Sequence, residues 1–326
     1  MSLDDELMAR AVAVAARARR DAPPNPWVGA LVLVNGEVIA EGSTQAPGAH
    51  HAEVEALARA GERSRGATMV VTLEPCDHVG RTPACTEAIL SSGIARVVVG
   101  LVDPDPRVAG RGIDRLRAAG LRVDVGAGAS LVADQLAPYL WHRRTGRPYV
   151  VAKVAATLDG VIAMADGSSQ WITGEAARAD AHELRAQSQA IIVGAATVRA
   201  DDPRLTARVD GRVLEPLRVV LGAAPPDARV RPCLEYTGEL ADLLDELGGR
   251  GVLQALVEGG AAVTSAFVEA GLVNRFAWYV APALAGASGT RAALADLSTP
   301  SMESLRRGRV VDVRRIGEDV RLDVEV

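Results

Sequence analysis

The spacing of apolar and polar residues predicts alternating helices and strands in the first half of the chain. Residues 4–20 carry an apolar stripe with helical spacing, and the stripe ends before Pro23-Pro24. Two apolar runs, 28–34 and 37–41, flank Asn35-Gly36, a pair typical of a tight hairpin turn. Beyond the hairpin we predict strands over 67–73, 95–101 and 121–125, and helices over 51–60, 84–92 and 112–119. Strands joined by short helices indicate crossovers and a mostly parallel sheet.

A second pattern of the same kind begins near residue 147. A predicted helix over 131–147 leads into Gly146-Arg-Pro148, and a chain of 326 residues is long enough for two domains. We therefore expect domains over 1–146 and 147–326. In the second we predict strands over 149–157, 190–194, 217–221, 252–257 and 276–280, helices over 175–187 and 261–270, and a closing hairpin over 309–326. Both domains are predicted to belong to the α/β class.

Composition and charge narrow the possible partners. The 36 basic and 41 acidic residues are scattered along the chain, which argues against binding to nucleic acid or to an anionic membrane. No apolar run approaches the ~18 residues of a membrane span, and the acidic start Met1-Ser-Leu-Asp-Asp-Glu is unlike a signal peptide. Three cysteines are too few for a disulfide framework, which favours a reducing compartment. We expect a cytoplasmic protein that acts on a small molecule.

Potential metal ligands are concentrated in one short stretch of the first half. This stretch, residues 50–85, contains three of the five histidines and two of the three cysteines: His50, His51, His78, Cys76 and Cys85. Such a mixture of imidazoles and thiols favours Zn²⁺. His51-Ala-Glu53 opens a predicted helix and Pro75-Cys76 follows a predicted strand, as in zinc-dependent deaminases, although eight residues rather than two separate the cysteines.

The chemistry of such a site gives each residue a task. One imidazole and two thiolates leave a fourth tetrahedral position for water, whose pKa zinc lowers towards ~7. A carboxylate two residues from the histidine ligand, here Glu53, is placed to move a proton from that water to a ring nitrogen and then to departing ammonia. The alternative is a closed structural zinc site in which His50 or His78 is the fourth ligand.

The residues between the cysteines point to one family. Leu73-Glu-Pro-Cys-Asp-His-Val-Gly-Arg-Thr-Pro-Ala-Cys85, with His51-Ala-Glu53 and Asn25-Pro-Trp-Val-Gly29, resembles the bifunctional riboflavin-biosynthesis deaminase–reductases known as RibD or RibG. The resemblance implies a cytidine-deaminase-like three-layer domain that removes the 2-amino group of 2,5-diamino-6-(5-phosphoribosylamino)pyrimidin-4(3H)-one. It implies zinc ligands His51, Cys76 and Cys85, the proton carrier Glu53, and substrate contacts from Asn25, His78, Arg81 and Thr82. Ala84 stands where the family commonly has a second proline.

Two glycine-containing segments of the chain are candidates for phosphate binding. Gly126-Ala-Gly128 follows a predicted strand but has Leu131 where the dinucleotide-binding motif needs a third glycine, so we reject it. Val257-Glu-Gly-Gly260 joins a strand end to a helix start, where backbone N–H groups attract a pyrophosphate. The alternative is that this segment is an ordinary strand–turn–helix connection that binds no phosphate.

Motifs of the second half resemble the reductase domain of the same family, whose fold is similar to dihydrofolate reductase. They are Lys153-Val-Ala-Ala-Thr-Leu-Asp-Gly160, Gly167-Ser-Ser-Gln-Trp-Ile-Thr173, Val193-Gly-Ala-Ala-Thr-Val198 and Asp201-Asp-Pro-Arg-Leu-Thr206. The resemblance implies NADPH-dependent reduction of the ribosyl chain of 5-amino-6-(5-phosphoribosylamino)uracil to ribityl, and we expect a homo-oligomer, a dimer or a tetramer.

The resemblance also assigns residues of the reductase domain. NADPH contacts are implied for Ala155, Trp171, Thr197, Asp201, Gly260, Ala261, Ala262, Val263, Thr264, Ser265 and Ala266. Substrate contacts are implied for Ser169, Arg185, Leu205, Arg208 and Glu258. Lys153 is the only lysine of the chain, and we assign it a catalytic role because a compact ammonium donates to ribose hydroxyls or to an imine-derived site as a broad guanidinium does not. The alternative is that this lysine has no special role and was retained by chance.

Three other functions remain to be distinguished at this point. One is a deaminase whose reductase-like domain is inactive or serves a riboflavin-like side pathway. A nucleotide-binding regulatory protein with two degraded sites is disfavoured by the complete set of His51, Glu53, Cys76 and Cys85. A nucleic-acid-editing deaminase needs a cationic groove, and the net charge of −5 argues against one.

Overall fold

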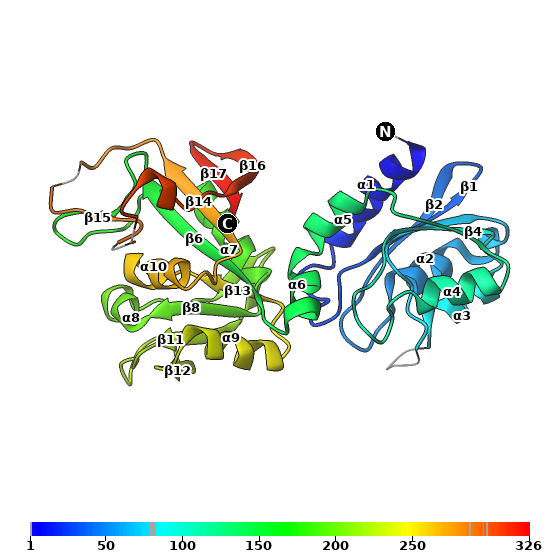
Figure 1. Ribbon diagram of the computed structural model, residues 1–326, viewed down its shortest axis with the longest axis horizontal. Helices are drawn as coiled ribbons and strands as arrows, with labels where there is room; N and C mark the ends of the chain where they lie inside the picture. Colours follow the sequence, from blue (N-terminus) through cyan, green and yellow to red (C-terminus); the bar gives the residue numbers. More distant parts are fainter. Residues whose placement is uncertain (1, 79–82, 287, 296, 298) are drawn as a thin grey trace. The chain divides into compact units, whose positions relative to one another are not determined.

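The computed structural model describes residues 2–78, 83–286, 288–295, 297 and 299–326. By its internal contacts the chain divides into two compact units, Met1–Gly146 and Arg147–Val326. Each unit contains its own β-sheet (Figure 1). The units are described separately below.

The amino-terminal unit is built on a five-stranded mixed sheet. The strand order is β2 (Glu37–Ser43), β1 (Gly29–Val34), β3 (Thr68–Leu73), β4 (Arg96–Leu101) and β5 (Arg122–Val125). The β1–β2 and β1–β3 pairs are antiparallel, whereas β3–β4 and β4–β5 are parallel. Four of the five strands therefore run in the same direction and β1 alone runs against them, so the predicted mostly parallel sheet with an antiparallel hairpin is confirmed. The Asn35-Gly36 hairpin reverses the chain, so the crossover from β2 places β3 beside β1 and antiparallel to it.

Helices cover both faces of this sheet and make three layers (Figure 1). One face carries α1 (Leu3–Ala16), α5 (Ala129–Gln135) and α6 (Ala137–Thr145), and the other carries α2 (Ala52–Ala60), the short 3₁₀ helix η1 (Gly61–Ser64), α3 (Cys85–Ser92) and α4 (Arg111–Ala118). Gly29 faces the backbone of α1, and Gly42 faces the backbone of α2 from the opposite side of the sheet. The absence of side chains at these two positions lets both helices approach the strands closely.

Two helix predictions in this unit need correction. The helix expected over 4–20 ends at Ala16, and the chain continues in turns that lead to the buried Ala18 and Ala22. The helix expected over 131–147 is two helices that meet at Leu136. Pro138 lies in the first turn of the second helix, where its missing N–H and its ring are tolerated, and it cannot lie in the middle of a continuous helix without breaking it.

The carboxy-terminal unit is built on an eight-stranded sheet. Its order is β12 (Leu234–Tyr236), β11 (Leu217–Leu221), β8 (Ala190–Gly194), β13 (Gln254–Val257), β6 (Tyr149–Thr157), β14 (Arg275–Ala281), β17 (Asp319–Glu325) and β16 (Arg309–Ile316). The first six strands are parallel, and the closing hairpin adds two antiparallel strands at one edge. The predicted α/β class and the terminal hairpin are thus both present.

Helices again lie on both faces of the sheet. The apolar core on one face joins strand residues such as Val150 and Ile192 to Leu243, Leu247 and Phe267 of α9 (Leu240–Gly249) and α10 (Ala261–Glu269). The other face carries α7 (Glu175–Ala186). The prediction missed α8 (Ala195–Asp201), α9, β12, the 3₁₀ helix η2 (Met302–Ser304) and the small ladders of β9 (Ala207–Val209) with β10 (Arg212–Leu214) and of β7 (Val161–Ala163) with β15 (Arg291–Ala292). The missed strands have two or three residues, too few to show a period.

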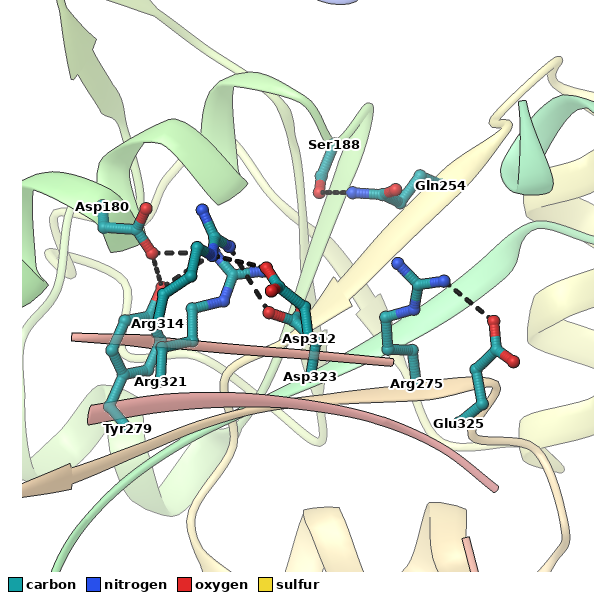
Figure 2. A network of polar contacts seen from close by, with 10 residues as sticks. All are labelled: Asp180, Ser188, Gln254, Arg275, Tyr279, Asp312, Arg314, Arg321, Asp323 and Glu325. Atoms are coloured by element: carbon teal, nitrogen blue, oxygen red, sulfur yellow. Dashed lines mark hydrogen bonds and ion pairs between the residues drawn. The ribbon is translucent and has the colours of Figure 1, made fainter. Parts of the chain in front are cut away.

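A buried polar network fixes α7 to the antiparallel edge of this sheet (Figure 2). The carboxylate of Asp180 accepts hydrogen bonds from the Tyr279 hydroxyl at 2.5 Å and from Arg321 Nη1 at 2.7 Å. Arg321 also donates to Asp323 at 2.7 Å, and Arg314 lies 3.4 Å from the same carboxylate. Because Tyr279, Arg321 and Asp323 are buried, each depends on these partners for its polar atoms.

The contact between β2 and α2 yields a test of the amino-terminal fold. A Cβ at Gly42 would lie 2.2 Å from the Ala52 carbonyl oxygen and 2.5 Å from the Ala56 nitrogen, so Gly42→Ala must push α2 outwards. Overpacking of this kind costs about 1–3 kcal/mol, and we expect the calorimetric unfolding midpoint to fall. Gly249→Ala is the control, since a Cβ there meets nothing within 4 Å. An unchanged midpoint for Gly42→Ala would contradict the close helix–strand packing.

Candidate functional site

Three potential metal ligands converge at the start of two helices in the amino-terminal unit. The ligand atoms of His51, Cys76 and Cys85 all lie within 4.8 Å of one another. His51 Nδ1 is 3.2 Å from Cys85 Sγ and 3.6 Å from Cys76 Sγ. His51 is the N-cap of α2, Cys85 is the first residue of α3, and Cys76 follows β3.

The loop after β3 is fixed by side chains that the sequence prediction did not single out. Asp77 accepts a hydrogen bond from the Thr86 hydroxyl at 2.6 Å and an ion pair from Arg115 at 2.8 Å. The Thr86 amide also donates to the Cys76 carbonyl at 3.2 Å. These contacts connect the segment of Cys76 to the first turn of α3, which contains Cys85, and so preorganise the thiol pair.

The donor set fits zinc and leaves one coordination position open. Tetrahedral zinc with Zn–S of ~2.3 Å and Zn–N of ~2.0 Å holds its ligand atoms roughly 3.5–3.8 Å apart, close to the separations found here. Within the described part of the chain, no fourth His, Cys, Asp or Glu joins the three-residue cluster. A closed structural site, with His50 or His78 as a fourth ligand, is therefore not what this geometry provides. Three ligands are typical of a catalytic zinc site.

Glu53 lies in the first turn of α2, two residues after His51, and is 4% exposed. Burial raises the pKa of its carboxyl to about 7, and the nearby His51 opposes that rise. Hydrogen bonds from Cys85 lower the pKa of the Cys76 thiol, whereas the pKa of Cys85 is raised by its hydrogen bond to Cys76 and by burial. The site thus places one buried carboxyl group beside the potential metal ligands.

A cavity of about 480 Å³ opens beside two of the three potential ligands, His51 and Cys76. Among the residues predicted to contact substrate, Asn25 and His78 line this cavity together with His51 and Cys76. Arg81 and Thr82 lie outside the described residues. The volume falls within the ~300–1,000 Å³ of typical small-molecule sites.

Sequence reasoning missed a polar cluster that lines the same site. A smaller cavity of about 100 Å³ is lined by Glu53 and also by residues not predicted to act there: Glu74, Asp103, Asp105, Arg107, Tyr139 and Arg143. Glu74 accepts hydrogen bonds from the amides of Asp103, Gly110, Gly112 and Ile113, so it fixes the loop that follows β4. Asp103-Pro-Asp-Pro-Arg107 directly after a predicted parallel strand was the available signal, because such strand ends form sites.

In the carboxy-terminal unit, three charged residues predicted to act together meet on the α7 side of the sheet. Arg185 of α7 pairs with Glu258, which follows β13, through two contacts of 2.6 and 2.7 Å. Although burial opposes ionisation, Arg185 and Lys153 hold the pKa of Glu258 below its ordinary value. Burial lowers the pKa of Lys153, which lies on β6, and Glu258 opposes that shift.

Arg208 on β9 and Leu205 just before β9 adjoin this ion pair through Thr206. Arg185 Nη1 donates to the Thr206 carbonyl at 3.3 Å. Arg208 is exposed and contacts His182 of α7, with 3.0 Å between Arg208 Nη2 and His182 Nε2. Leu205 is 3% exposed and has a positive φ of 53°, so its side chain belongs to the core of this segment. His182 is a neighbour of the predicted substrate residues that the sequence did not reveal.

The glycine turn predicted to hold a phosphate lies where β13 leads into α10. A Cβ at Gly259 would lie 2.5 Å from Val263 Cβ, whereas one at Gly260 would meet only Thr197 Oγ1, 3.8 Å away. The turn and Thr197, both predicted to contact NADPH, are therefore neighbours, and the space in front of Gly260 is open to a ligand. The partly exposed first turn of α10 offers backbone N–H groups to a pyrophosphate.

The other predicted cofactor and substrate residues are distributed around these groups. Ala155 lies on β6 and Asp201 ends α8, while Trp171 is 70% exposed and stacks against Arg178 at 4.7 Å. Ser169 lies in the same segment as Trp171 and is half-buried. Along α10, Gly260, Ala261, Ala262, Val263 and Ala266 reach the surface to varying degrees, whereas Thr264 and Ser265 are buried and Ser265 accepts a hydrogen bond from the Ala295 amide.

Across the described residues, each helix is too short or too polar to cross a lipid bilayer.

Family comparisons match both units. The family described as the RibD C-terminal domain matches residues 148–322, and the cytidine and deoxycytidylate deaminase zinc-binding region matches residues 1–101. The riboflavin biosynthesis protein RibD of Mycobacterium tuberculosis H37Rv is 42% identical over 332 residues, covering 98% of this chain and 96% of the relative. The Escherichia coli K12 protein of that name is 37% identical, covering 97% and 98%.

Solved structures agree with these matches. Acinetobacter baumannii RibD superposes with a TM-score of 0.92 at 38% identity, covering 99% of this chain and 98% of that one. A Thermotoga maritima protein described as a diaminohydroxyphosphoribosylaminopyrimidine deaminase and 5-amino-6-(5-phosphoribosylamino)uracil reductase superposes with a TM-score of 0.88 at 31% identity, covering 99% and 98%.

The ligand geometry predicts how zinc content responds to mutation. We expect about one zinc per chain in the purified protein, and a clear loss in Cys76→Ala and in Cys85→Ala, because each removes a thiolate ligand. Cys233→Ala is the matched control, since Cys233 lies in the other unit and outside the cluster. Elemental analysis by mass spectrometry measures the content. Zinc that stays stoichiometric without both Cys76 and Cys85 would refute the ligand assignment.

Proposed function

Because the chain belongs to the RibD family of bifunctional riboflavin-biosynthesis enzymes, we propose that residues 1–146 carry its deaminase activity and residues 147–326 its NADPH-dependent reductase activity. The proposed first substrate is 2,5-diamino-6-(5-phosphoribosylamino)pyrimidin-4(3H)-one. Its deaminated product, 5-amino-6-(5-phosphoribosylamino)uracil, is the proposed substrate of the reductase, which converts the ribosyl chain to ribityl. The observation that carries the proposal is the presence of two separate constellations, His51–Cys76–Cys85 with Glu53 and Arg185–Glu258 with Lys153.

In the deaminase unit the residues divide the work as follows. Zinc held by His51, Cys76 and Cys85 supplies a Lewis acid that makes water a nucleophile at neutral pH. Glu53 takes a proton from the attacking water, delivers it to a ring nitrogen of the pyrimidine, and transfers a proton to the departing ammonia. Asn25 and His78 line the cavity and hold the pyrimidine edge. We keep Arg81 and Thr82 as further substrate contacts from the family resemblance.

In the reductase unit the cofactor and the substrate are assigned to neighbouring groups. NADPH supplies a hydride for the ribose carbon of the substrate. The open space in front of Gly260, Thr197 beside it and the first turn of α10 are proposed to hold its pyrophosphate. Lys153 donates from its ammonium to the ribose hydroxyls or to the nitrogen of the opened imine. The Arg185–Glu258 pair and the neighbouring Arg208, with Ser169 and Leu205, are proposed to contact the substrate.

Two further features belong to the same proposal. We propose that the enzyme works in the cytoplasm, because the three free cysteines include two proposed zinc ligands that must stay reduced. We also propose a homo-oligomer, a dimer or a tetramer. In its support, β16 forms an edge of the eight-stranded sheet, and Val310 and Val313 on it are more than half exposed.

The two activities are expected to be separable by point mutation. Glu53→Gln keeps the shape of the side chain and removes the base, so ammonia release should fall by about 10²–10⁴ while zinc content is retained. The same variant should still oxidise NADPH when given 5-amino-6-(5-phosphoribosylamino)uracil, because Lys153 and Arg185 lie in the other unit. Lys153→Ala should show the reverse behaviour.

Each reaction is measured on its own substrate, ammonia by a coupled assay and NADPH by absorbance. Loss of both reactions in Glu53→Gln would show that the units are not independent catalysts. Wild-type protein that releases ammonia but never oxidises NADPH would leave the deaminase alone as the function of the chain.

The glycine turn before α10 yields a separate test of the NADPH site. Gly260→Asp would place a carboxylate where the pyrophosphate approaches, and we expect a loss of NADPH affinity of at least about tenfold from charge repulsion. Gly260→Ala is the matched control, because a Cβ there has 3.8 Å of clearance to Thr197 Oγ1. Fluorescence titration of NADPH measures both. Equal affinity in the aspartate variant and the wild type would place the cofactor elsewhere.

A further inference from the structure

We propose that Arg107 and Arg143 form the subsite for the 5′-phosphate of the deaminase substrate, and thereby distinguish the phosphorylated pyrimidine from its unphosphorylated riboside. The inference rests on the proposed deaminase function and adds to it the residues that read the phosphate. Arg107 lies in the loop after β4, and Arg143 lies on α6, so 36 positions of sequence separate two groups that meet at one cavity.

The charge of the cavity wall is the first observation. The described residues that line the cavity of about 480 Å³ are Pro24, Asn25, Pro47, Gly48, Ala49, His51, Cys76, His78, Arg107 and Arg143. This described lining includes two guanidinium groups and no carboxylate. A ligand in contact with the zinc ligands His51 and Cys76 therefore shares its cavity with two permanent positive charges, which suits an anionic group on that ligand.

The buried carboxylate of Asp105 brings the two arginines together. Arg107 donates to Asp105 from Nε at 3.0 Å and from Nη2 at 2.7 Å, and Arg143 Nε lies 3.4 Å from the same Oδ2. Since nitrogens of both guanidinium groups contact one oxygen atom, the two groups are close enough to bind one phosphate. A single carboxylate between two arginines also leaves an excess of positive charge for a ligand.

Other contacts hold Arg143 in place and leave donors for a ligand. Its guanidinium stacks 4.9 Å from the centre of the Tyr139 ring, and its Nη1 lies 3.2 Å from His142 Nδ1. Arg143 Nε is buried and makes no hydrogen bond among the described residues, although it lies 3.4 Å from Asp105 Oδ2; His78 Nδ1 on the cavity wall is also buried without a hydrogen-bond partner among them. Buried polar atoms of this kind are rare unless water or a ligand completes them.

The other acidic groups nearby are already engaged. The Glu74 carboxylate accepts hydrogen bonds from four backbone amides, and Asp103 accepts two contacts of 3.1 Å from the Tyr139 hydroxyl. Both line the smaller cavity beside Glu53 and are absent from the described lining of the larger one. The described acidic groups therefore line only the smaller cavity, whereas Arg107 and Arg143 line both cavities.

Phosphate is the anion that matches this arrangement and the proposed substrate. Guanidinium groups present paired N–H donors whose spacing suits phosphate oxygens, and they stay charged at any physiological pH. The proposed substrate joins a pyrimidine to a ribosyl 5-phosphate, and the cavity volume is ample for such an extended molecule. With the pyrimidine beside His51 and Cys76, the phosphate is the part of the substrate left to meet the arginines.

The test compares two substrates in three variants. Ammonia release is measured with the phosphorylated diaminopyrimidine and with the same compound lacking its phosphate, for Arg107→Gln, Arg143→Gln and the double variant. We expect kcat/KM for the phosphorylated compound to fall about 10- to 100-fold per arginine, because hydrogen bonds to charged groups are lost. We expect kcat/KM for the unphosphorylated compound to stay at the wild-type value, and inorganic phosphate to inhibit its turnover in the wild type more than in the double variant.

Arg144→Gln is the matched control, since Arg144 is exposed on the same helix and does not line the cavity. Zinc content verifies that each variant keeps its site, and Arg107→Lys, which keeps the charge, should show a smaller loss confined to the phosphorylated compound. An equal loss on both compounds, or no loss on either, would overturn the phosphate subsite. Wild-type protein that releases ammonia from neither compound would instead refute the proposed deaminase function.

Discussion

The convergence of two helix starts on one strand end is the constraint on which the amino-terminal unit depends. His51 caps α2, Cys85 begins α3, and Cys76 follows β3, so all three ligands are fixed by backbone geometry rather than by flexible side chains. Helix starts are electropositive and favour negatively charged groups, although the hydrogen bond to Cys76 and burial raise the pKa of the Cys85 thiol. The close approach of α2 to β2 at Gly42 belongs to the same requirement, because α2 carries both His51 and Glu53.

The two units meet the problem of buried charge in different ways. In the first, the donor set suits a cation, and Glu53 is a carboxyl whose pKa burial raises to about 7. In the second, a bidentate pair of Arg185 and Glu258 stays ionised beside Lys153. A buried ion pair contributes little net stability, since desolvation offsets the attraction. Its presence at the carboxyl end of β13 is therefore better explained by the need to hold a polar ligand than by the need to fold.

The sequence predicted correctly those elements that short-range interactions determine. The hairpin at Asn35-Gly36, the long strand Tyr149–Thr157 and the terminal hairpin are confirmed because short-range turn chemistry and period fix them. The break between two helices at Leu136 was missed, although Pro138 is a sequence signal for a helix start. Strands of two or three residues were missed because they are too short to show an alternation of apolar and polar residues. The cluster of Asp105, Arg107 and Arg143 escaped for another reason: only tertiary folding joins a loop after β4 to a helix far along the chain.

The network that fixes α7 to the edge of the sheet joins residues that lie far apart in the sequence. Asp180 lies five positions before Arg185 on α7, whereas its partners Tyr279 and Arg321 lie on β14 and β17. Substitution of one member leaves the others buried with unpaired polar atoms. A single substitution therefore destabilises the fold, whereas simultaneous substitutions that restore the pairing do not. The residues at these three positions are therefore expected to change together in evolution. Substitutions there are expected to be correlated among relatives, and a record of such joint changes would trace how the orientation of Arg185 has been maintained.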